Sequence, residues 1–282
     1  MPKASPPACD PGLAIGPLRD WLRLHPRLFV VTGAGCSTGA GIPDYRDENG
    51  DWKRPQPVTY QAFMGDAATR RRYWARSLAG WPVMGGARPG AAHHALARLE
   101  RQGRIELLLT QNVDGLHHAA GSRRVIDLHG RIDTVRCMDC EARTPRAELQ
   151  RELLRRNPAW AALSASAAPD GDADLQGRDF QSFDVPPCPR CGTGLLKPDV
   201  VFFGESVPRG RVDAAHAALA RADAVLVAGS SLMVYSGYRF VQAAAQRGLP
   251  VAAINRGRTR ADGLLALKLE ADVGQALEQL SY

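Results

Sequence analysis

The stretch LFVVTGAGCS, residues 28–37, joins a short apolar run to a turn that contains two glycines. Every residue of the run LFVV is apolar, which is typical of a strand buried on both faces of a parallel sheet. Glycines that follow such a strand let backbone N–H groups approach a pyrophosphate, and a helix N-terminus beyond them favours its negative charge. The stretch therefore predicts a phosphate-binding turn at the end of a parallel strand.

The same alternation of apolar runs and loops continues along the chain. Runs at 105–109, 224–228 and 251–254 are followed by the loops TQNVDG, GSSLMVYS and NRGRT. Apolar residues at helical spacing lie between the runs, for example at 91–102 and 211–221. This order predicts an α/β fold with a Rossmann-like, doubly wound parallel sheet, whose ligands bind at the carboxyl ends of the strands.

The glycine turn differs from the one found in ordinary dehydrogenases. Thr38 stands where a third glycine is usual, and no clear acidic residue follows a second strand about twenty residues on. These two differences disfavour a hydride-transferring dehydrogenase, although a nucleotide site remains indicated.

Four cysteines form two tight pairs. The motifs are Cys137-x-x-Cys140 and Cys188-x-x-Cys191, and two such turns complete a tetrahedral zinc site. Two disulfides in a secreted protein and a redox dithiol are the alternatives. Four thiolates leave no coordination position for water, so we predict one structural zinc ion that takes no part in catalysis.

Two stretches of the sequence interrupt the regular order of strands and helices and indicate a second domain. We predict a Rossmann-like nucleotide-binding domain made of residues 18–52, 104–133 and 196–282. A smaller domain would combine a helical module, 53–103, with a zinc-ribbon module, 134–195. The two modules interrupt the alternation of strands and helices.

The chain is basic, with a formal net charge of +7. This charge is compatible with solvated helix faces or with attraction to anionic partners, including nucleic acid. The insert between the cysteine pairs is acidic, and basic residues do not alternate with aromatic ones, which disfavours a nucleic-acid-binding zinc ribbon. Residues 1–17 lack a secretory or transit pattern and no apolar run is long enough to span a membrane, so we expect a cytoplasmic protein.

Several histidines need an interpretation. His129 follows an expected strand and precedes a glycine, which would let a ligand come close, although a lone histidine is more often structural. His93 and His94 open an expected helix and are interpreted as structural. His117 and His118 follow the polar loop and are interpreted as helix-surface residues.

Eight motifs occur in an order that resembles the sirtuins. They are GAGCSTGAGIPDYR, TQNVDGLHHAAGS, DLHG, the two cysteine pairs, KPDVVFFGE, GSSLMVYS and INRG. The motif PDYR, the run RRRYWARSLAGWP and the long insert between the cysteine pairs resemble the class II branch, which contains a mitochondrial lipoamidase. Sirtuins are NAD-dependent protein deacylases, so the resemblance implies that activity.

The resemblance also implies roles for individual residues. His129 would be the general base. Residues that match the NAD-binding motifs are Gly33, Ala34, Gly35, Ser37, Asp44, Tyr45, Arg46, Gln111, Asn112, Asp114, Gly229, Ser230, Ser231, Asn255, Arg256, Gly257 and Val273. Two segments would pair with the backbone of the substrate: Val200, Val201, Phe202, Phe203 and Gly204, and Val234, Tyr235 and Ser236.

The acyl group is less well defined by sequence. Tyr73 and Arg76 resemble the Tyr-x-x-Arg pair with which desuccinylating sirtuins hold an acyl carboxylate; alternatively, Arg76 is a surface cation. The expected reaction transfers an acyl group from a protein lysine to ADP-ribose and releases nicotinamide. Transfer of ADP-ribose to protein is the alternative that uses the same NAD site. Expected partners are acyl-lysine proteins or peptides, with no specific nucleic acid, no membrane and a monomeric enzyme.

Overall fold

A computed structural model describes residues 15–53, 56–160 and 179–280. Its centre is a six-stranded parallel sheet of order β3-β2-β1-β7-β8-β9. The strands are β1 (Leu28–Thr32), β2 (Ile105–Thr110), β3 (Val125–Asp127), β7 (Ala224–Ala228), β8 (Val251–Ile254) and β9 (Leu267–Leu269). The four apolar runs are strands of this sheet, so the predicted parallel α/β architecture is confirmed.

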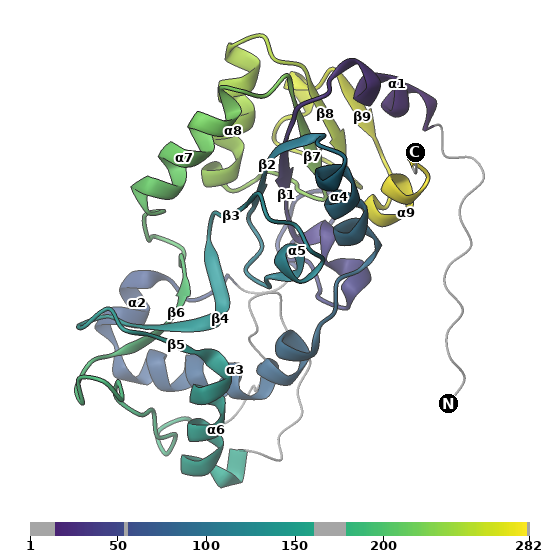
Figure 1. The fold of residues 1–282 in the computed structure, drawn as a ribbon. Helices are drawn as coiled ribbons and strands as arrows, with labels where there is room; N and C mark the ends of the chain where they lie inside the picture. Colours follow the sequence, from purple (N-terminus) through teal and green to yellow (C-terminus); the bar gives the residue numbers. More distant parts are fainter. Residues whose placement is uncertain (1–14, 54–55, 161–178, 281–282) are drawn as a thin grey trace, which may run out of the picture.

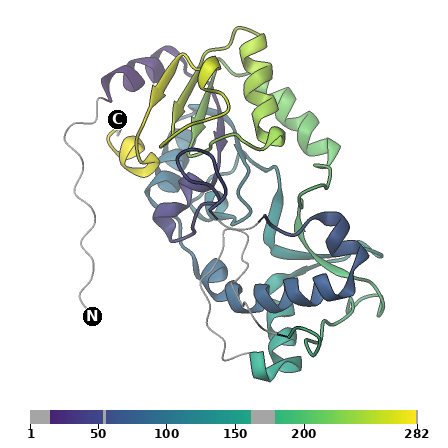
Figure 2. The same cartoon turned by 180° about the vertical axis from the view of Figure 1, so that it is seen from behind.

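Helices cover both faces of the sheet (Figures 1 and 2). One face packs against α1 (Gly16–Leu24), α4 (Ala91–Arg101) and α9 (Val273–Glu278). The other packs against α7 (Arg209–Leu219) and α8 (Tyr235–Gln246). The central strands β1 and β7 are buried along their whole length, as apolar runs between two helical layers should be.

A second, smaller assembly lies below the sheet in Figure 1. The strands β4 (Gly130–Cys137), β5 (Arg143–Pro145) and β6 (Leu196–Val200) form an antiparallel sheet of order β5-β4-β6. It is accompanied by α2 (Tyr60–Gly65), α3 (Ala67–Gly86) and α6 (Arg146–Arg156). Their shared core is rich in aromatic side chains, among them Phe63, Trp74 and Phe183.

The structure refines the expected domain division at two places. Helix α4, expected in the helical module, packs Leu96 and Leu99 into the same core as β1 and β2. Strand β6, expected in the NAD-binding domain, pairs with β4 instead. The division into two domains remains our proposal, with α4 placed beside the parallel sheet. Most of the insert expected to be a loop, and the N-terminal tail, lie outside the described residues.

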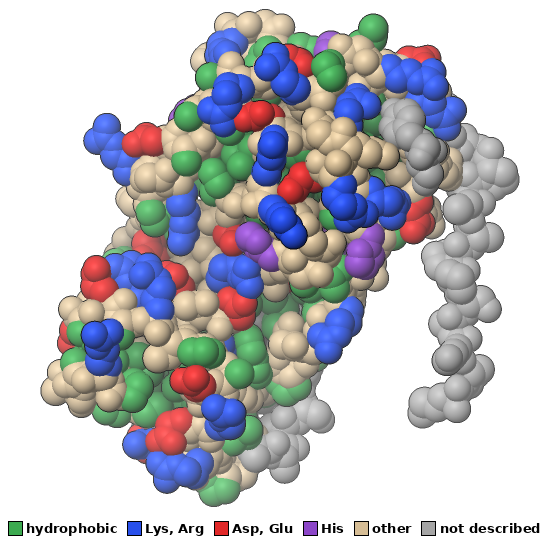
Figure 3. Space-filling model, viewed as in Figure 1, with side chains coloured by type: hydrophobic (Ala, Val, Ile, Leu, Met, Phe, Trp, Pro, Cys, Tyr) green, Lys and Arg blue, Asp and Glu red, His purple; other side chains and the backbone are tan. Residues whose placement is uncertain are grey.

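Short helices complete the fold: η1 (Ala34–Cys36), η2 (Thr38–Ala40), α5 (Leu116–Ala119), η3 (Pro158–Trp160) and η4 (Asp262–Leu264). In the parts of the chain that the structure describes, no helix combines the length and apolar character needed to cross a bilayer. On the face shown in Figure 3, cationic side chains are dispersed among acidic ones instead of forming a continuous stripe.

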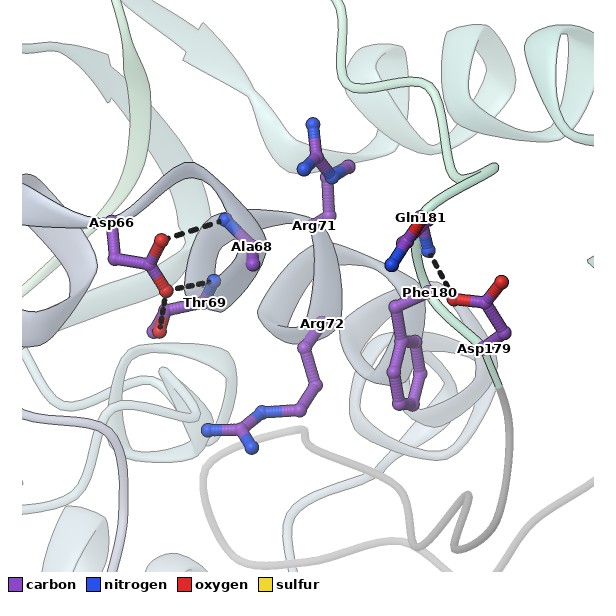
Figure 4. A pocket seen from close by; sticks show the side chains of 8 residues that line it. All are labelled: Asp66, Ala68, Thr69, Arg71, Arg72, Asp179, Phe180 and Gln181. Carbon is purple, nitrogen blue, oxygen red and sulfur yellow. Dashed lines mark hydrogen bonds between the residues drawn. The ribbon is translucent and has the colours of Figure 1, made fainter.

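Asp66 caps the N-terminus of the long helix α3, and its carboxylate accepts hydrogen bonds from the backbone N–H groups of Ala68 and Thr69 (Figure 4). This is the usual way to satisfy donors at a helix N-terminus. A surface pocket beside this cap is lined by Arg71, Arg72 and Phe180 among others. It lies apart from the larger cavity at the edge of the parallel sheet, because the two have no lining residue in common.

Candidate active site

The main cavity, of about 630 Å³, lies where the carboxyl ends of β1, β2, β7 and β8 meet loops of the smaller assembly. Its volume is in the range of small-molecule and cofactor sites. It brings together most of the residues singled out from the sequence: Gly33, Ala34, Gly35, Ser37, Asp44, Tyr45, Arg46, Gln111, Asn112, Asp114, His129, Val200, Val201, Phe202, Phe203, Gly204, Gly229, Ser230, Ser231, Val234, Tyr235, Ser236, Asn255, Arg256 and Val273. Gly257, Tyr73 and Arg76 do not line it.

Two glycine turns approach each other at the floor of the cavity. Gly35 donates a backbone hydrogen bond of 2.9 Å to the carbonyl oxygen of Gly229. A Cβ atom at Gly33 would lie 2.8 Å from the side chain of Ser230, and one at Gly35 would lie 2.9 Å from the Cα atom of Gly229. Both distances are too short for a side chain, so the close approach of the two turns requires glycine here.

A connected polar network lies beside these turns. Asn112 donates to the carbonyl oxygen of Gly33 at 2.9 Å and to the hydroxyl of Ser37 at 3.0 Å, and Ser37 donates to the carboxylate of Asp114 at 2.7 Å. Gln111 donates to the hydroxyl of Ser230 at 2.8 Å. The loops after β1, β2 and β7 are therefore fixed to one another by side chains that also line the cavity.

Two buried histidines, His93 and His117, contact hydroxyl groups of Ser37 and Thr32 in the segment that carries the first glycine turn. His93 accepts a hydrogen bond from the backbone N–H of Gly90 through Nδ1, and its Nε2 lies 3.4 Å from the hydroxyl of Ser37. His117 lies 3.0 Å from the hydroxyl of Thr32 and is 1% exposed, so its interpretation as a helix-surface residue is wrong. Burial lowers the pKa of both rings. The structural interpretation of His93 agrees with these contacts.

His129 stands at the junction between β3 and β4, with its ring toward the cavity. Its Nδ1 lies 3.0 Å from the carbonyl oxygen of Gln111. Because a carbonyl only accepts, Nδ1 carries the proton and Nε2 keeps its lone pair. Burial lowers the pKa of His129 to about 4, with a smaller lowering from the charges of Arg211 and Arg239, while the bond to Gln111 raises it. The ring is therefore neutral at pH 7.

The loop after η2 places aromatic and charged side chains over the cavity. The guanidinium of Arg46 lies 3.9 Å from the centre of the Trp52 ring, and that ring meets Phe203 edge-on at 5.7 Å. Lys53 pairs with Asp44 at 2.6 Å. Trp52 and Lys53 line the cavity and were not selected from the sequence. Their place next to the PDYR motif was the available signal.

The segment from Val200 to Gly204 is held as a defined edge of the cavity. Val201 donates its backbone N–H to the carbonyl oxygen of His129 at 2.8 Å, and Phe203 accepts from the backbone N–H of Tyr60 at 2.8 Å. At its base, the buried Lys197 pairs with Glu205 at 3.0 Å. Glu205 also accepts the backbone N–H of Phe202 at 2.9 Å, which fixes the turn.

Tyr73 and Arg76 lie on α3 and do not line the cavity. Tyr73 is buried in an aromatic cluster in which its ring centre lies 5.4 Å from that of Phe202 and 5.3 Å from that of Phe63. Because Phe202 lines the cavity, one side chain separates Tyr73 from it.

The four cysteine sulfurs converge far from His129, at the end of β4. All lie within 4.8 Å of one another, and the Cys137–Cys191 and Cys140–Cys188 separations are both 3.8 Å. Zn–S bonds of about 2.3 Å in a tetrahedron place sulfurs about 3.8 Å apart, so the residues fit zinc. Disulfide bonding requires about 2.05 Å, and the described cysteines are free.

Backbone N–H groups point at these sulfurs, as thiolate ligands require. Cys140 donates to the sulfur of Cys137 at 3.5 Å, Arg190 to that of Cys188 at 3.3 Å, and Gly194 to that of Cys191 at 3.3 Å. A Cβ atom at Gly194 would lie 2.2 Å from the sulfur of Cys137, so the knuckle requires glycine.

The parallel sheet, the cavity at its carboxyl edge and the remote thiol cluster place the chain among α/β enzymes that bind a dinucleotide and carry a structural metal module. The model of the Sir2 family matches residues 33–236. The chain belongs to the Sir2 family.

Individual relatives agree with this membership. An NAD-dependent protein deacetylase of Xanthomonas axonopodis pv. citri is 68% identical over 260 residues, covering 92% of this chain and 88% of its own length. The mitochondrial NAD-dependent protein lipoamidase sirtuin-4 of Bos taurus is 48% identical over 274 residues, covering 96% and 86%. A solved Sir2 structure with a p53 peptide and NAD⁺ superposes with a TM-score of 0.77 at 29% identity, covering 95% of this chain and 97% of that chain.

Proposed function

We infer that this protein is an NAD-dependent protein-lysine deacylase, which transfers the acyl group to ADP-ribose and releases nicotinamide. The observation that carries this inference is the position of His129: a neutral imidazole whose Nε2 carries no proton faces the same cavity as the glycine turn after β1. Membership of the Sir2 family and the names of the relatives support the same activity.

The residues around the cavity fit NAD. The turn at Gly33 and Gly35 has no room for side chains, so its backbone forms part of the cavity surface and a pyrophosphate could approach it closely. When bound, NAD would supply an activated ribose carbon that accepts the acyl oxygen while nicotinamide leaves. We assign the pyrophosphate to the turn formed by Gly33, Ala34, Gly35 and Ser37.

The other NAD contacts follow from the loops that form the cavity. We assign the nicotinamide ribose and carboxamide to Gln111, Asn112 and Asp114, under the loop that carries Asp44, Tyr45 and Arg46. The adenosine half would lie against Gly229, Ser230, Ser231, Asn255, Arg256 and Val273, all of which line the cavity. Gly257 does not line it, and we assign it the role of shaping the loop: its φ is +73°, and a Cβ atom there would lie 2.3 Å from the carbonyl oxygen of Glu48.

We assign the general base to His129. Its Nδ1–H is held by Gln111, so Nε2 is the atom that can accept a proton from a ribose hydroxyl. The surrounding loops, with Arg46 against Trp52 on one side and the Val200 segment on the other, would exclude water from the reacting atoms.

The peptide substrate would pair with the backbone of two segments. We place it between residues 200–204 and residues 234–236, because both segments line the cavity and both contact His129. Pairing through the main chain tolerates many sequences. We also propose that the enzyme acts as a monomer in the cytoplasm, where a reducing environment keeps the four cysteines available to zinc.

Product analysis tests this function. The protein is incubated with NAD and peptides that carry different acyl-lysines, and nicotinamide and O-acyl-ADP-ribose are measured by mass spectrometry. We expect both products in equal amounts, and we expect His129→Ala to lose about 10²–10⁴-fold in rate while still binding NAD. ADP-ribose attached to protein without O-acyl-ADP-ribose would show the alternative activity, and near-normal turnover of His129→Ala would refute the assigned base.

A further inference from the structure

His129 has a second partner, which the deacylase function does not explain. The hydroxyl of Ser236 lies 2.7 Å from Nε2 of His129. Since Nδ1 carries the ring proton and is held by the carbonyl of Gln111, the hydroxyl of Ser236 donates and Nε2 accepts. A hydroxyl bonded to a base, with the base oriented by a third group, is the arrangement of an activated serine nucleophile.

The surroundings of Ser236 suit a nucleophile. It lines the main cavity and is the second residue of α8, a helix of 12 residues. The first N–H groups of a helix have no partner within it and carry partial positive charge. Such charge beside Oγ stabilises an oxygen that becomes negative during acyl transfer. Arg239 adds a cation on the next turn, where its Nε donates to the carbonyl oxygen of Ser236 at 3.1 Å.

We propose that Ser236 and His129 form a catalytic dyad that hydrolyses small acyl esters and thioesters without NAD. Oγ of Ser236 attacks the acyl carbonyl carbon as its proton passes to Nε2 of His129. The bond to the leaving alcohol or thiol breaks, and that group takes the proton from His129. Water then attacks the acyl-serine, gives one proton back through His129 to Oγ, and releases the carboxylic acid.

The basicity of His129 limits the substrate class. A ring whose pKa lies near 4 is a weak base but, once protonated, a strong acid. It therefore favours substrates with a leaving group that departs readily, such as a thiol or a phenol. Amides need a stronger push from the nucleophile, so lysine amides remain substrates of the NAD-dependent reaction only.

The two reactions compete for one atom. In the NAD-dependent reaction proposed above, Nε2 of His129 serves a ribose hydroxyl, whereas the dyad needs Nε2 for Ser236. Bound NAD should therefore inhibit ester hydrolysis. This relation rests on the proposed NAD position, but hydrolysis in the absence of NAD does not.

The test is hydrolysis of p-nitrophenyl butyrate and of a butyryl thioester of N-acetylcysteamine by the full chain, in buffer free of NAD. We expect saturable hydrolysis that falls at least about 10²-fold in Ser236→Ala and in His129→Ala. Intact-mass and peptide mass spectrometry should find a transient butyryl group on Ser236, and Ser236→Cys should retain acylation. Adding NAD should slow the wild-type reaction in a concentration-dependent way.

Ser122→Ala is the matched control, because Ser122 is buried, does not line the cavity, and its hydroxyl has no hydrogen-bond partner in the described structure. It should hydrolyse both esters at the wild-type rate. Ester hydrolysis that is absent, unchanged in Ser236→Ala, or linked to acylated lysine or cysteine would overturn the dyad. Parallel deacylation assays with NAD separate the two proposals. If the wild-type protein deacylates peptides but does not hydrolyse the esters, only the dyad is refuted. If it hydrolyses the esters but does not deacylate peptides, only the proposed function is refuted.

Discussion

The backbone N–H of Gly35 donates to the carbonyl oxygen of Gly229 at 2.9 Å, which joins the turn after β1 to the turn after β7. Gly229 adopts a φ of +62°, and a Cβ atom there would lie 2.5 Å from the backbone nitrogen of Cys36. The contact is therefore possible only between residues without side chains. It fixes the floor of the cavity at the place assigned to the pyrophosphate.

Gly229→Ala should disrupt this floor. The left-handed backbone and the clash together are expected to cost about 1–3 kcal/mol and to raise the KM for NAD more than tenfold. Gly39→Ala is the matched control, because a Cβ atom there meets nothing within 4 Å. Denaturant unfolding and initial rates at varied NAD measure the two effects, and equal behaviour of both variants would contradict the argument.

Lys197 and Glu205 form an ion pair that closes the base of the Val200 segment. The Lys197 side chain is 4% exposed, and burial lowers its pKa. Lys197→Met should leave the Glu205 carboxylate without its cation and lower the free energy of unfolding by about 2 kcal/mol. This loss is smaller than for a fully buried pair because the Glu205 side chain is partly exposed. Because the segment is the proposed peptide-binding edge, the KM for peptide should rise more than the KM for NAD.

The double variant Lys197→Met/Glu205→Gln provides the check on this pair. It should regain part of the lost stability, because no unpaired charge remains. Arg209→Met, which removes the cation of the exposed pair Arg209–Asp213, should change stability very little. If Lys197→Met and Arg209→Met lost the same amount of stability, the buried ion pair would contribute no more than the exposed one.

The four strands β1, β2, β7 and β8 and the four-cysteine cluster could be predicted because their signals are local. Runs such as residues 28–31 are apolar at every position, and the spacing of each cysteine pair is set within four residues. The pairing of β6 with β4 and the burial of His117 depend on contacts between distant segments, for which no short pattern exists. Trp52 follows the PDYR motif in the sequence, but its edge-on contact with Phe203 at the cavity joins segments that lie far apart along the chain.

The pH dependence follows from the lowered pKa of His129. A base with a pKa near 4 in the folded enzyme stays neutral across the physiological range, so kcat/KM for deacylation should not fall between pH 8 and about pH 6. An ordinary exposed histidine would instead lose half of its base form near pH 6.5. A falling limb centred at pH 6.5 or above would exclude the assigned environment.

Stability should respond to the same group. The unfolded chain binds a proton at His129 near pH 6.5 and the folded chain near pH 4, so the stabilisation is present above pH 6.5 and is lost as pH falls toward 4. The full difference corresponds to about 3 kcal/mol. When the free energy of unfolding from denaturant titrations is plotted against pH, the curves of wild type and His129→Gln should therefore differ in slope below pH 6.5. Parallel curves would show that His129 titrates alike in both states.

The thiol cluster should hold one zinc ion that stabilises the smaller assembly. Cys140→Ser should lower the zinc content from about one ion per chain and reduce the melting temperature, because metal binding and folding are coupled in such modules. Cys9→Ser, which alters a cysteine outside both pairs, should change neither. Metal analysis and thermal unfolding decide the point, and full activity after complete zinc removal would contradict a structural role.

Arg76 is a candidate residue for selectivity toward carboxylated acyl groups. Phe202 separates Tyr73 from the cavity, and Arg76 follows three residues later on the same helix, so we propose that these two side chains bind the carboxylate of an acidic acyl chain. Arg76→Leu should then lower kcat/KM for succinyl-, glutaryl- and hydroxymethylglutaryl-lysine peptides at least tenfold, with little change for acetyl-lysine. Arg72→Leu, on the exposed side of the same helix, controls for loss of charge. Equal losses for acidic and neutral acyl groups would show that Arg76 supports the helix without reading the substrate.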